Sequence, residues 1–131
     1  MTEARVATSL GCVAIDLESD EAFLVDDDPP IADRVEVSLP LVIAAAQSGS
    51  RIVAAVDRRP PLMISDDVGL TWREAGGGLP VGTAVAVDPE NPDRLLFASA
   101  TRVYLSETGG LFWRSLEVEL IDITAVAFAD A

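Results

Sequence analysis

The stretch from Ser65 to Trp72 reads SDDVGLTW, and forty-one positions later Ser106 to Trp113 reads SETGGLFW. The two loops share serine, glycine, leucine and tryptophan at the same places, and an arginine follows the tryptophan in both. The match continues without a gap, so that residues 65–89 and 106–130 are identical at 10 of 25 positions. A chain that carries one small loop twice in the same context is built from repeats.

A third, weaker copy precedes these two. The segment VAIDLESDEAFLV, residues 13–25, aligns with the loop at 65–72, and four of its residues take the places of the serine, the aspartate, the glycine and the tryptophan: Asp16, Glu18, Asp20 and Phe23. Three copies in one order, 40 to 50 residues apart, predict a single domain over residues 1–131 with repeats at about 5–50, 51–93 and 94–131.

Each repeat has the pattern of β-strands. Short runs such as TAVAV, RLLFASA and RVYLS are rich in β-favouring residues and are separated by Gly, Pro, Asp or Asn. No segment keeps a helical period over a dozen residues. Four short strands in about 40 to 45 residues are typical of a propeller blade. The sequence therefore predicts an all-β fold of three four-stranded β-propeller blades.

The loop at 65–72 resembles the aspartate box of BNR-type propellers, the sialidase-like and sortilin-like families, because it fits Ser-x-Asp-x-Gly-x-Thr-Trp at every defined position. The resemblance implies a hairpin turn between the third and fourth strands of a blade, away from the axial pocket. Its residues then have a structural role: Ser65, Asp67, Gly69, Thr71 and Trp72, with Ser106, Gly110 and Trp113 in the second copy. The second copy departs from the pattern at Thr108 and Phe112.

The residue types of the box suggest how it works. Asp67 can accept hydrogen bonds from donors of its own turn, and Gly69 can adopt a positive φ. Trp72 and Trp113 are expected to pack between blades, with Phe23 as their counterpart in the first copy. None of these residues is expected to be catalytic.

The charge balance and the missing residue types exclude several classes of partner and of catalytic mechanism. The chain has 22 acidic residues, 9 arginines, no lysine and no histidine, for a net charge of −13. Such a field repels nucleic acid and anionic membranes and favours a cationic partner. The absence of histidine excludes Ser-His-Asp and Cys-His catalysis, and a zinc site cannot be built from one cysteine. Cys12 is expected to be buried, and the absence of a signal peptide or an apolar span predicts a cytoplasmic protein.

These observations favour a non-enzymatic binding or scaffold module without cofactor or metal, whose ligand is a protein or a glycan. One alternative is a glycoside-processing enzyme that uses carboxylates such as Asp57 or Asp88. Another is an engineered or remnant propeller fragment without a ligand. The acidic insertion VDDDPPIADR, residues 25–34, could hold a hard cation, although carboxylate runs are usually solvated.

The ends of the chain predict assembly. Residues 123–131 read as the first strand of a blade, whereas the N-terminus begins at a second strand. Three blades are too few to close around an axis. We therefore expect residues 123–131 to complete a blade of a partner chain in a six-bladed homodimeric ring, with a trimer as the second possibility.

Overall fold

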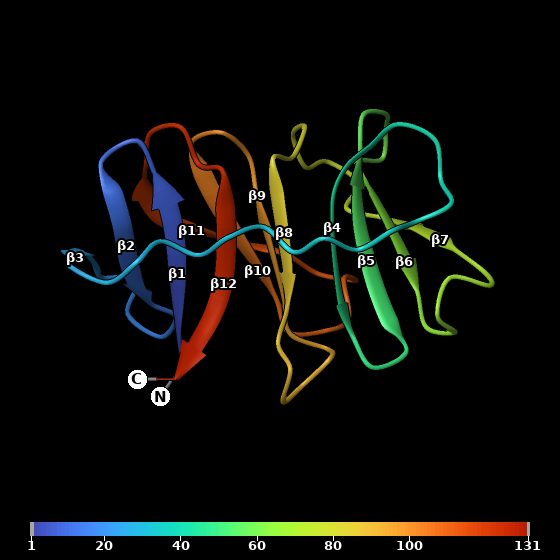
Figure 1. Ribbon diagram of the computed structural model, residues 1–131, viewed down its shortest axis with the longest axis horizontal. Helices are drawn as coiled ribbons and strands as arrows, with labels where there is room; N and C mark the ends of the chain where they lie inside the picture. Colours follow the sequence, from blue (N-terminus) through green and yellow to red (C-terminus); the bar gives the residue numbers. More distant parts are fainter. Residues whose placement is uncertain (1, 131) are drawn as a thin grey trace.

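The computed structural model describes residues 2–130, which form twelve strands in three four-stranded antiparallel sheets and no helix (Figure 1). Blade B contains β4 (Val42–Ser48), β5 (Arg51–Val56), β6 (Leu62–Ser65) and β7 (Arg73–Ala75). Blade C contains β8 (Ala84–Val87), β9 (Leu95–Ala98), β10 (Arg102–Ser106) and β11 (Arg114–Glu119). The predicted all-β fold of three four-stranded blades is confirmed.

Blade A is closed by the two ends of the chain. It contains β1 (Thr2–Thr8), β2 (Gly11–Asp16) and β3 (Ala22–Val25), and β12 (Ala125–Asp130) is its innermost strand. Strand β12 pairs antiparallel with β1 of the same chain, from Thr2 opposite Asp130 to Ala7 opposite Ala125. In the single chain, the strand that we expected to enter a partner's blade therefore completes the chain's own blade.

The blades follow one another in the order B, C, A (Figure 1). Their first strands, β4, β8 and β12, lie side by side, with β8 between the other two. Each sequence repeat begins at the second strand of one blade and ends with the first strand of the next, so every junction between repeats lies within a sheet. This overlap joins the three sheets into one unit.

Two apolar clusters hold the blades together. Between C and A, Leu96 and Val103 pack with Val13 and Ile15. Between B and C, Phe97 lies against the rings of Tyr104 and Trp113, each with a centroid distance of 6.1 Å, in a cluster with Leu62 and Ile64. Alternation along the strands places these side chains, because every second residue of a strand points to the same neighbouring blade.

A third cluster lies on the outer face of blade B, where no further blade packs. Residues 26–41, called the strap below, leave β3 and cross in front of the inner strands to reach blade B (Figure 1). Val35, Val37 and Leu39 alternate along the strap and pack against this face together with Trp72 and Met63. The acidic insertion thus begins a segment that covers the end of the domain.

The structure corrects the prediction for Phe23. Its side chain is 59 % exposed, whereas Trp72 and Trp113 are half-buried. Phe23 lies opposite Ala14, on the face of blade A that points away from blade C. The aligned residues of blades B and C face the other way, and a shift of one residue in register moves a whole strand pattern to the other face. The first copy has undergone such a shift.

Candidate functional site

The loop at 65–72 is closed by the side chains of Ser65, Asp67 and Thr71. Ser65 Oγ accepts a hydrogen bond from Gly69 N at 2.8 Å and donates to Asp67 Oδ1 at 2.7 Å. Asp67 Oδ1 also accepts from Thr71 N at 2.8 Å, and Thr71 Oγ1 donates to Asp67 Oδ2. The hydrogen bonds from Thr71, and then that from Ser65, lower the pKa of Asp67 to about 2. A carboxylate engaged in this way organises a turn and is a poor general acid.

The loop at 106–113 keeps the same fold despite its departures. Ser106 Oγ accepts from Gly110 N at 2.9 Å, as Ser65 does from its glycine. Thr108 Oγ1 accepts from Phe112 N at 2.9 Å and so replaces the carboxylate of the first loop with a hydroxyl. Trp113 Nε1 donates to the Gly110 carbonyl at 3.1 Å. One acceptor at the third position of the loop is therefore sufficient for this turn.

The first copy forms a different turn. Asp16 Oδ1 accepts from the backbone N–H groups of Glu18 and Ser19 at 2.8 and 3.2 Å. Asp20, aligned with the loop glycine, has a positive φ of 62°. The turn is shorter, because Ile15 pairs directly with Ala22.

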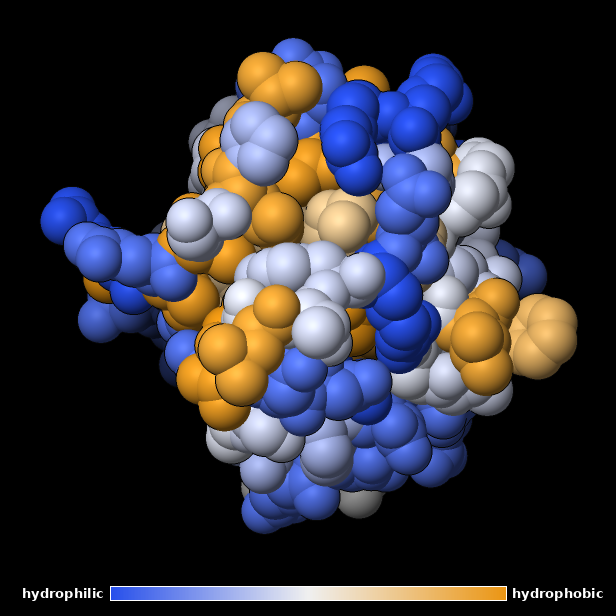
Figure 2. Space-filling view, turned by 90° about the vertical axis from the view of Figure 1, so that its right-hand side faces the viewer, coloured by the Kyte–Doolittle hydropathy of each residue, from blue (hydrophilic) through white to orange (hydrophobic). Residues whose placement is uncertain are grey.

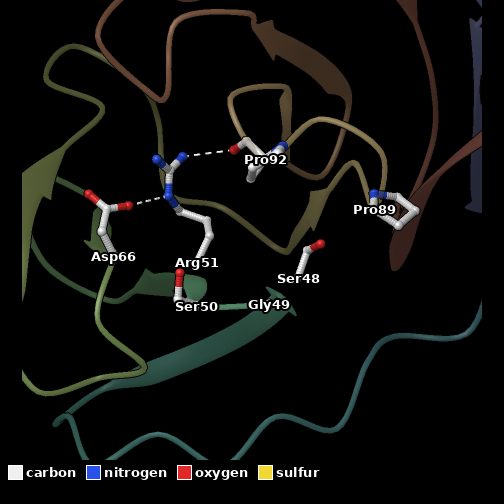
Figure 3. Close-up of a pocket in the computed structure, with 7 residues that line it drawn as sticks. All are labelled: Ser48, Gly49, Ser50, Arg51, Asp66, Pro89 and Pro92. Carbon is white, nitrogen blue, oxygen red and sulfur yellow. Dashed lines mark hydrogen bonds and ion pairs between the residues drawn. The ribbon is translucent and has the colours of Figure 1, made fainter.

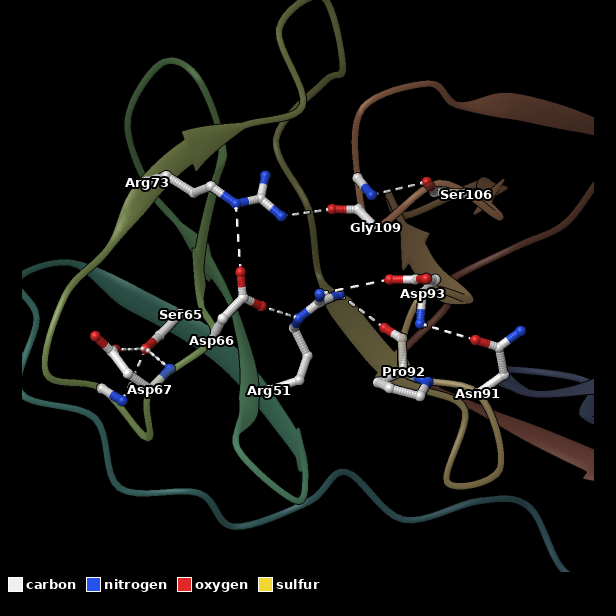
Figure 4. A network of polar contacts seen from close by, with 12 residues as sticks. Arg51, Ser65, Asp66, Asp67, Arg73, Asn91, Pro92, Asp93, Ser106 and Gly109 are labelled. Atoms are coloured by element: carbon white, nitrogen blue, oxygen red, sulfur yellow. Dashed lines mark hydrogen bonds and ion pairs between the residues drawn. The ribbon is translucent and has the colours of Figure 1, made fainter.

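The arginine after each tryptophan connects its loop to the next blade. Arg73 of blade B donates from Nη2 to the carbonyl of Gly109 in blade C at 2.8 Å (Figure 4). Arg114 of blade C donates to the Leu17 carbonyl of blade A at 2.8 Å and binds both carboxylate oxygens of Asp20. The two arginines make the same bridge one blade apart. Sequence reasoning assigned them no role, although their identity in the repeat was a usable signal.

A hollow of about 400 Å³ opens at the seam between blades B and C (Figure 3). It is lined by Ser48, Gly49, Ser50, Arg51, Asp66, Pro89 and Pro92. Arg51 lies against its wall with a side chain only 13 % exposed. Its guanidinium binds Asp66, donates to the Pro92 carbonyl at 2.7 Å and approaches Asp93 at 3.5 Å.

A matching arginine lies one blade further on. Arg94, at the start of the second strand of blade C, approaches Glu107 at 3.8 Å and Asp88 at 3.5 Å, and its guanidinium lies 5.5 Å from the ring centre of Phe128. Glu107 occupies the repeat position of Asp66. Since each arginine contacts both its own loop and the next blade, these pairs have a structural role.

The second hollow, of about 250 Å³, lies beneath the strap beside the inner strands. Its lining is mostly apolar, with Val87, Val126 and Phe128 on the strands and Ile31 on the strap. Asp33 is its one lining carboxylate among the described residues. A glycosidase mechanism needs two carboxylates, and in the described part of the chain each of these hollows is lined by only one, Asp66 or Asp33.

The other residues singled out in the sequence, Asp57, Asp88 and Cys12, do not line either of these hollows. Asp57 is exposed at the end of β5, and Asp88 is buried, where its Oδ1 accepts from Glu90 N at 2.9 Å across the turn that contains Pro89. Cys12 is a buried free thiol. The structure brings neither Asp57 nor Asp88 together with a second free carboxylate.

Metal ligands and membrane spans are not found in the described part of the chain. Within residues 2–130, no group of three or more acidic or cysteine side chains is arranged to hold an ion. Asp26 and Asp28 of the acidic insertion are exposed, and Asp27 pairs with Arg5. The same residues contain no helix of the length and hydrophobicity that a bilayer crossing requires.

Comparisons with known proteins support the fold. No family model matches the chain, and no curated protein matches its sequence. Among solved structures, a crystal structure of the GH74 enzyme of Niastella koreensis aligns with 93 % of this chain at 22 % identity and a TM-score of 0.52. The chain spans 19 % of that enzyme. At this identity the likeness shows a β-propeller-type fold.

Proposed function

We propose that the chain is a non-enzymatic binding module of the aspartate-box type, and that its partner is positively charged. The resemblance of the loops at 65–72 and 106–113 to aspartate boxes supports the family assignment. Asp67 serves its own turn, as expected for a structural box. Among the described residues, the hollow at the seam of blades B and C and the hollow beneath the strap are each lined by a single carboxylate, Asp66 and Asp33, which supports binding over hydrolysis.

We infer a positively charged partner from the positions of the arginines. Most of the nine arginines make contacts inside the chain, to carboxylates or to backbone carbonyls: Arg5, Arg51, Arg58, Arg73, Arg94, Arg102 and Arg114. Many carboxylates are instead exposed, among them Glu90, Glu117 and Glu119. The positive charge is thus used between and within blades, and the outer surface is left strongly acidic.

The test is a titration of the chain with an arginine-rich peptide and, as a control, with a glutamate-rich peptide of equal length. We expect binding of the basic peptide alone, with an affinity that falls as ionic strength rises. The variant D33N/E90Q/E117Q/E119Q should bind more weakly, whereas N91A/T101A, which changes exposed neutral side chains, should bind as the wild type does. Equal affinity for both peptides, or none for either, would refute the proposal.

A glycoside-processing enzyme is the second candidate, and the likeness to the GH74 enzyme favours it. A screen with aryl glycosides separates the two candidates. Release of the aryl group by the wild type, at a rate reduced in Asp33→Asn, would establish the enzyme and place its chemistry beneath the strap. Absence of release from all substrates is the result expected for a binding module.

A further inference from the structure

We infer that two copies of this chain exchange strand β12 and close into a six-bladed ring. In this ring blade B follows blade A of its own chain, blade C follows blade B, and β12 enters blade A of the second copy. The free faces of blades A and B of one chain then meet each other, and the second copy closes the ring by supplying β12 to that blade A. This inference is independent of the charged partner proposed above.

The arc ends in two sheet faces that no blade covers. On blade A, this face has the small, buried side chains of Cys12 and Ala14, and Phe23 projects from it with 59 % of its surface exposed. On blade B, Met63 and Trp72 lie on the free face. In each case the opposite face of the sheet packs against blade C.

The repeat indicates what belongs on the free face of blade B. Trp113, at the corresponding place in blade C, packs into the cluster between C and the preceding blade. Trp72 has no preceding blade in the single chain and contacts the cluster around Val35, Val37 and Leu39 of the strap. The strap side chains thus occupy the place that blade A of a neighbouring position would take. Figure 2, which views this end of the molecule, shows separate apolar patches among polar residues.

The arginine bridges point to the same two faces. Blades C and A each receive one bridge on their turn from the preceding blade, through Arg73 and Arg114. The corresponding turn of blade B has Val68 and Leu70 60 % and 84 % exposed. In the alignment, Leu24 of blade A replaces the bridging arginine and is 63 % exposed. The register change in blade A puts Leu24 opposite Val13, on the face toward blade C, so the exposed apolar residues at the open junction are Val68 and Leu70 on blade B and Phe23 on blade A.

The strap provides the hinge. Between blades B and C the chain needs eight residues, 76–83, and between C and A it needs five, 120–124. The strap has sixteen, 26–41, because in the single chain it crosses the inner strands of three blades. In the ring it spans a single step. Exchange then preserves the B–C and C–A interfaces and changes only the path of the strap, which is the geometry of a domain swap.

Disulfide trapping tests the exchange. Ala7 of β1 lies opposite Ala125 of β12, within the spacing of paired strands that a disulfide accepts. In a Cys12→Ser background, Ala7→Cys with Ala125→Cys should give covalent dimers on a non-reducing denaturing gel after purification at high concentration. The matched control is Ala84→Cys with Ala98→Cys, a pair within blade C that should cross-link inside one chain.

The outcomes are decisive in both directions. Cross-links within one chain for both cysteine pairs would overturn the exchange, even if the protein were dimeric by mass. Should the cysteine variants fail to fold, deletion of residues 27–34 leaves a strap of eight residues, which is long enough for one step. That variant should have the mass of two chains by light scattering, and a folded single chain would overturn the inference.

Discussion

Arg73 of blade B donates a hydrogen bond to the carbonyl oxygen of Gly109 in blade C at 2.8 Å, and Arg114 makes the equivalent bond to Leu17 of blade A at the same distance. The two bonds join the turns of successive blades at the outer part of the arc, while the apolar clusters join them further in. Both bridges have the same polarity, because in each one the arginine belongs to one blade and the carbonyl to the blade that follows.

Loss of a bridge should weaken the contact between two blades. We expect Arg114→Ala to lower the free energy of unfolding by about 1–2 kcal/mol, because it removes charge-assisted hydrogen bonds to Asp20, whose side chain is only 8 % exposed. The control is Arg58→Ala, whose exposed pair with Glu74 lies within blade B and should contribute less than about 0.5 kcal/mol. Urea unfolding measures both. Equal losses would mean that the bridge is no stronger than a surface ion pair.

Gly110 allows blades B and C to approach closely. A Cβ atom at this position would lie 2.5 Å from Ile64 Cδ1 of blade B, and the backbone has a φ of 92°. Gly78 has a similar φ of 89° but open space around it. Gly78→Ala should therefore lower the free energy of unfolding by about 1–2 kcal/mol, because of the backbone conformation alone. Gly110→Ala should lower it by about 1–3 kcal/mol more, because of the additional clash.

The additional loss of stability in Gly110→Ala should depend on the side chain of Ile64. In a double-mutant cycle, Ile64→Val removes the atom that would clash, so it should cost less in the Gly110→Ala background than in the wild type. Additive losses, or equal costs at Gly78 and Gly110, would contradict the close approach of the blades.

Val68 is a strained residue in the first loop. It has a φ of 59°, and the second loop has Gly109 at this place with a φ of 66°. We expect Val68→Gly to raise the free energy of unfolding by about 0.5–1 kcal/mol, because the left-handed conformation costs a β-branched residue more than a glycine. Val81→Gly, at a half-exposed position of the loop at 76–83, should be destabilising. Thermal melts that shift in the same direction for both variants would contradict this explanation.

These loops also show how far the sequence predicts the fold. The turn at 65–72 could be predicted because its bonds link residues at most four positions apart, and the loop at 106–113 keeps them even with Thr108 in place of the aspartate. The number of blades followed from the repeat. Phe23 was predicted wrongly, because a single change of register in β2 and β3 reverses which face meets blade C, and no local pattern records that change.

The candidate site was less predictable than the fold. The bridges of Arg73 and Arg114 depend on the distance between blades, although their identity in the repeat marked both positions. The strap was visible as an insertion, and the alternation of Val35, Val37 and Leu39 was a signal that it covers an apolar face. Its path across the inner strands follows from the order of the blades in space, which the chain order alone does not give.

Asp67 should make the stability depend on pH. Its pKa is lowered from 3.8 to about 2 in the folded chain, so its contribution is complete above the unfolded value and is lost as the pH falls through the folded value. The difference in stability between the wild type and Asp67→Asn should therefore be largest near neutral pH and shrink between pH 3.8 and about 2. The exposed Asp57→Asn is the control. A difference that does not change with pH would show that the ionised form is not the one that holds the turn.

In the proposed assembly, one chain of three blades forms half of a closed ring. Light scattering on the wild-type protein, over a range of concentrations, measures this directly. A chain of 13.8 kDa should give a particle of twice that mass. A single species of 13.8 kDa at the highest concentration would contradict the ring and leave the strapped, three-bladed arc as the complete molecule.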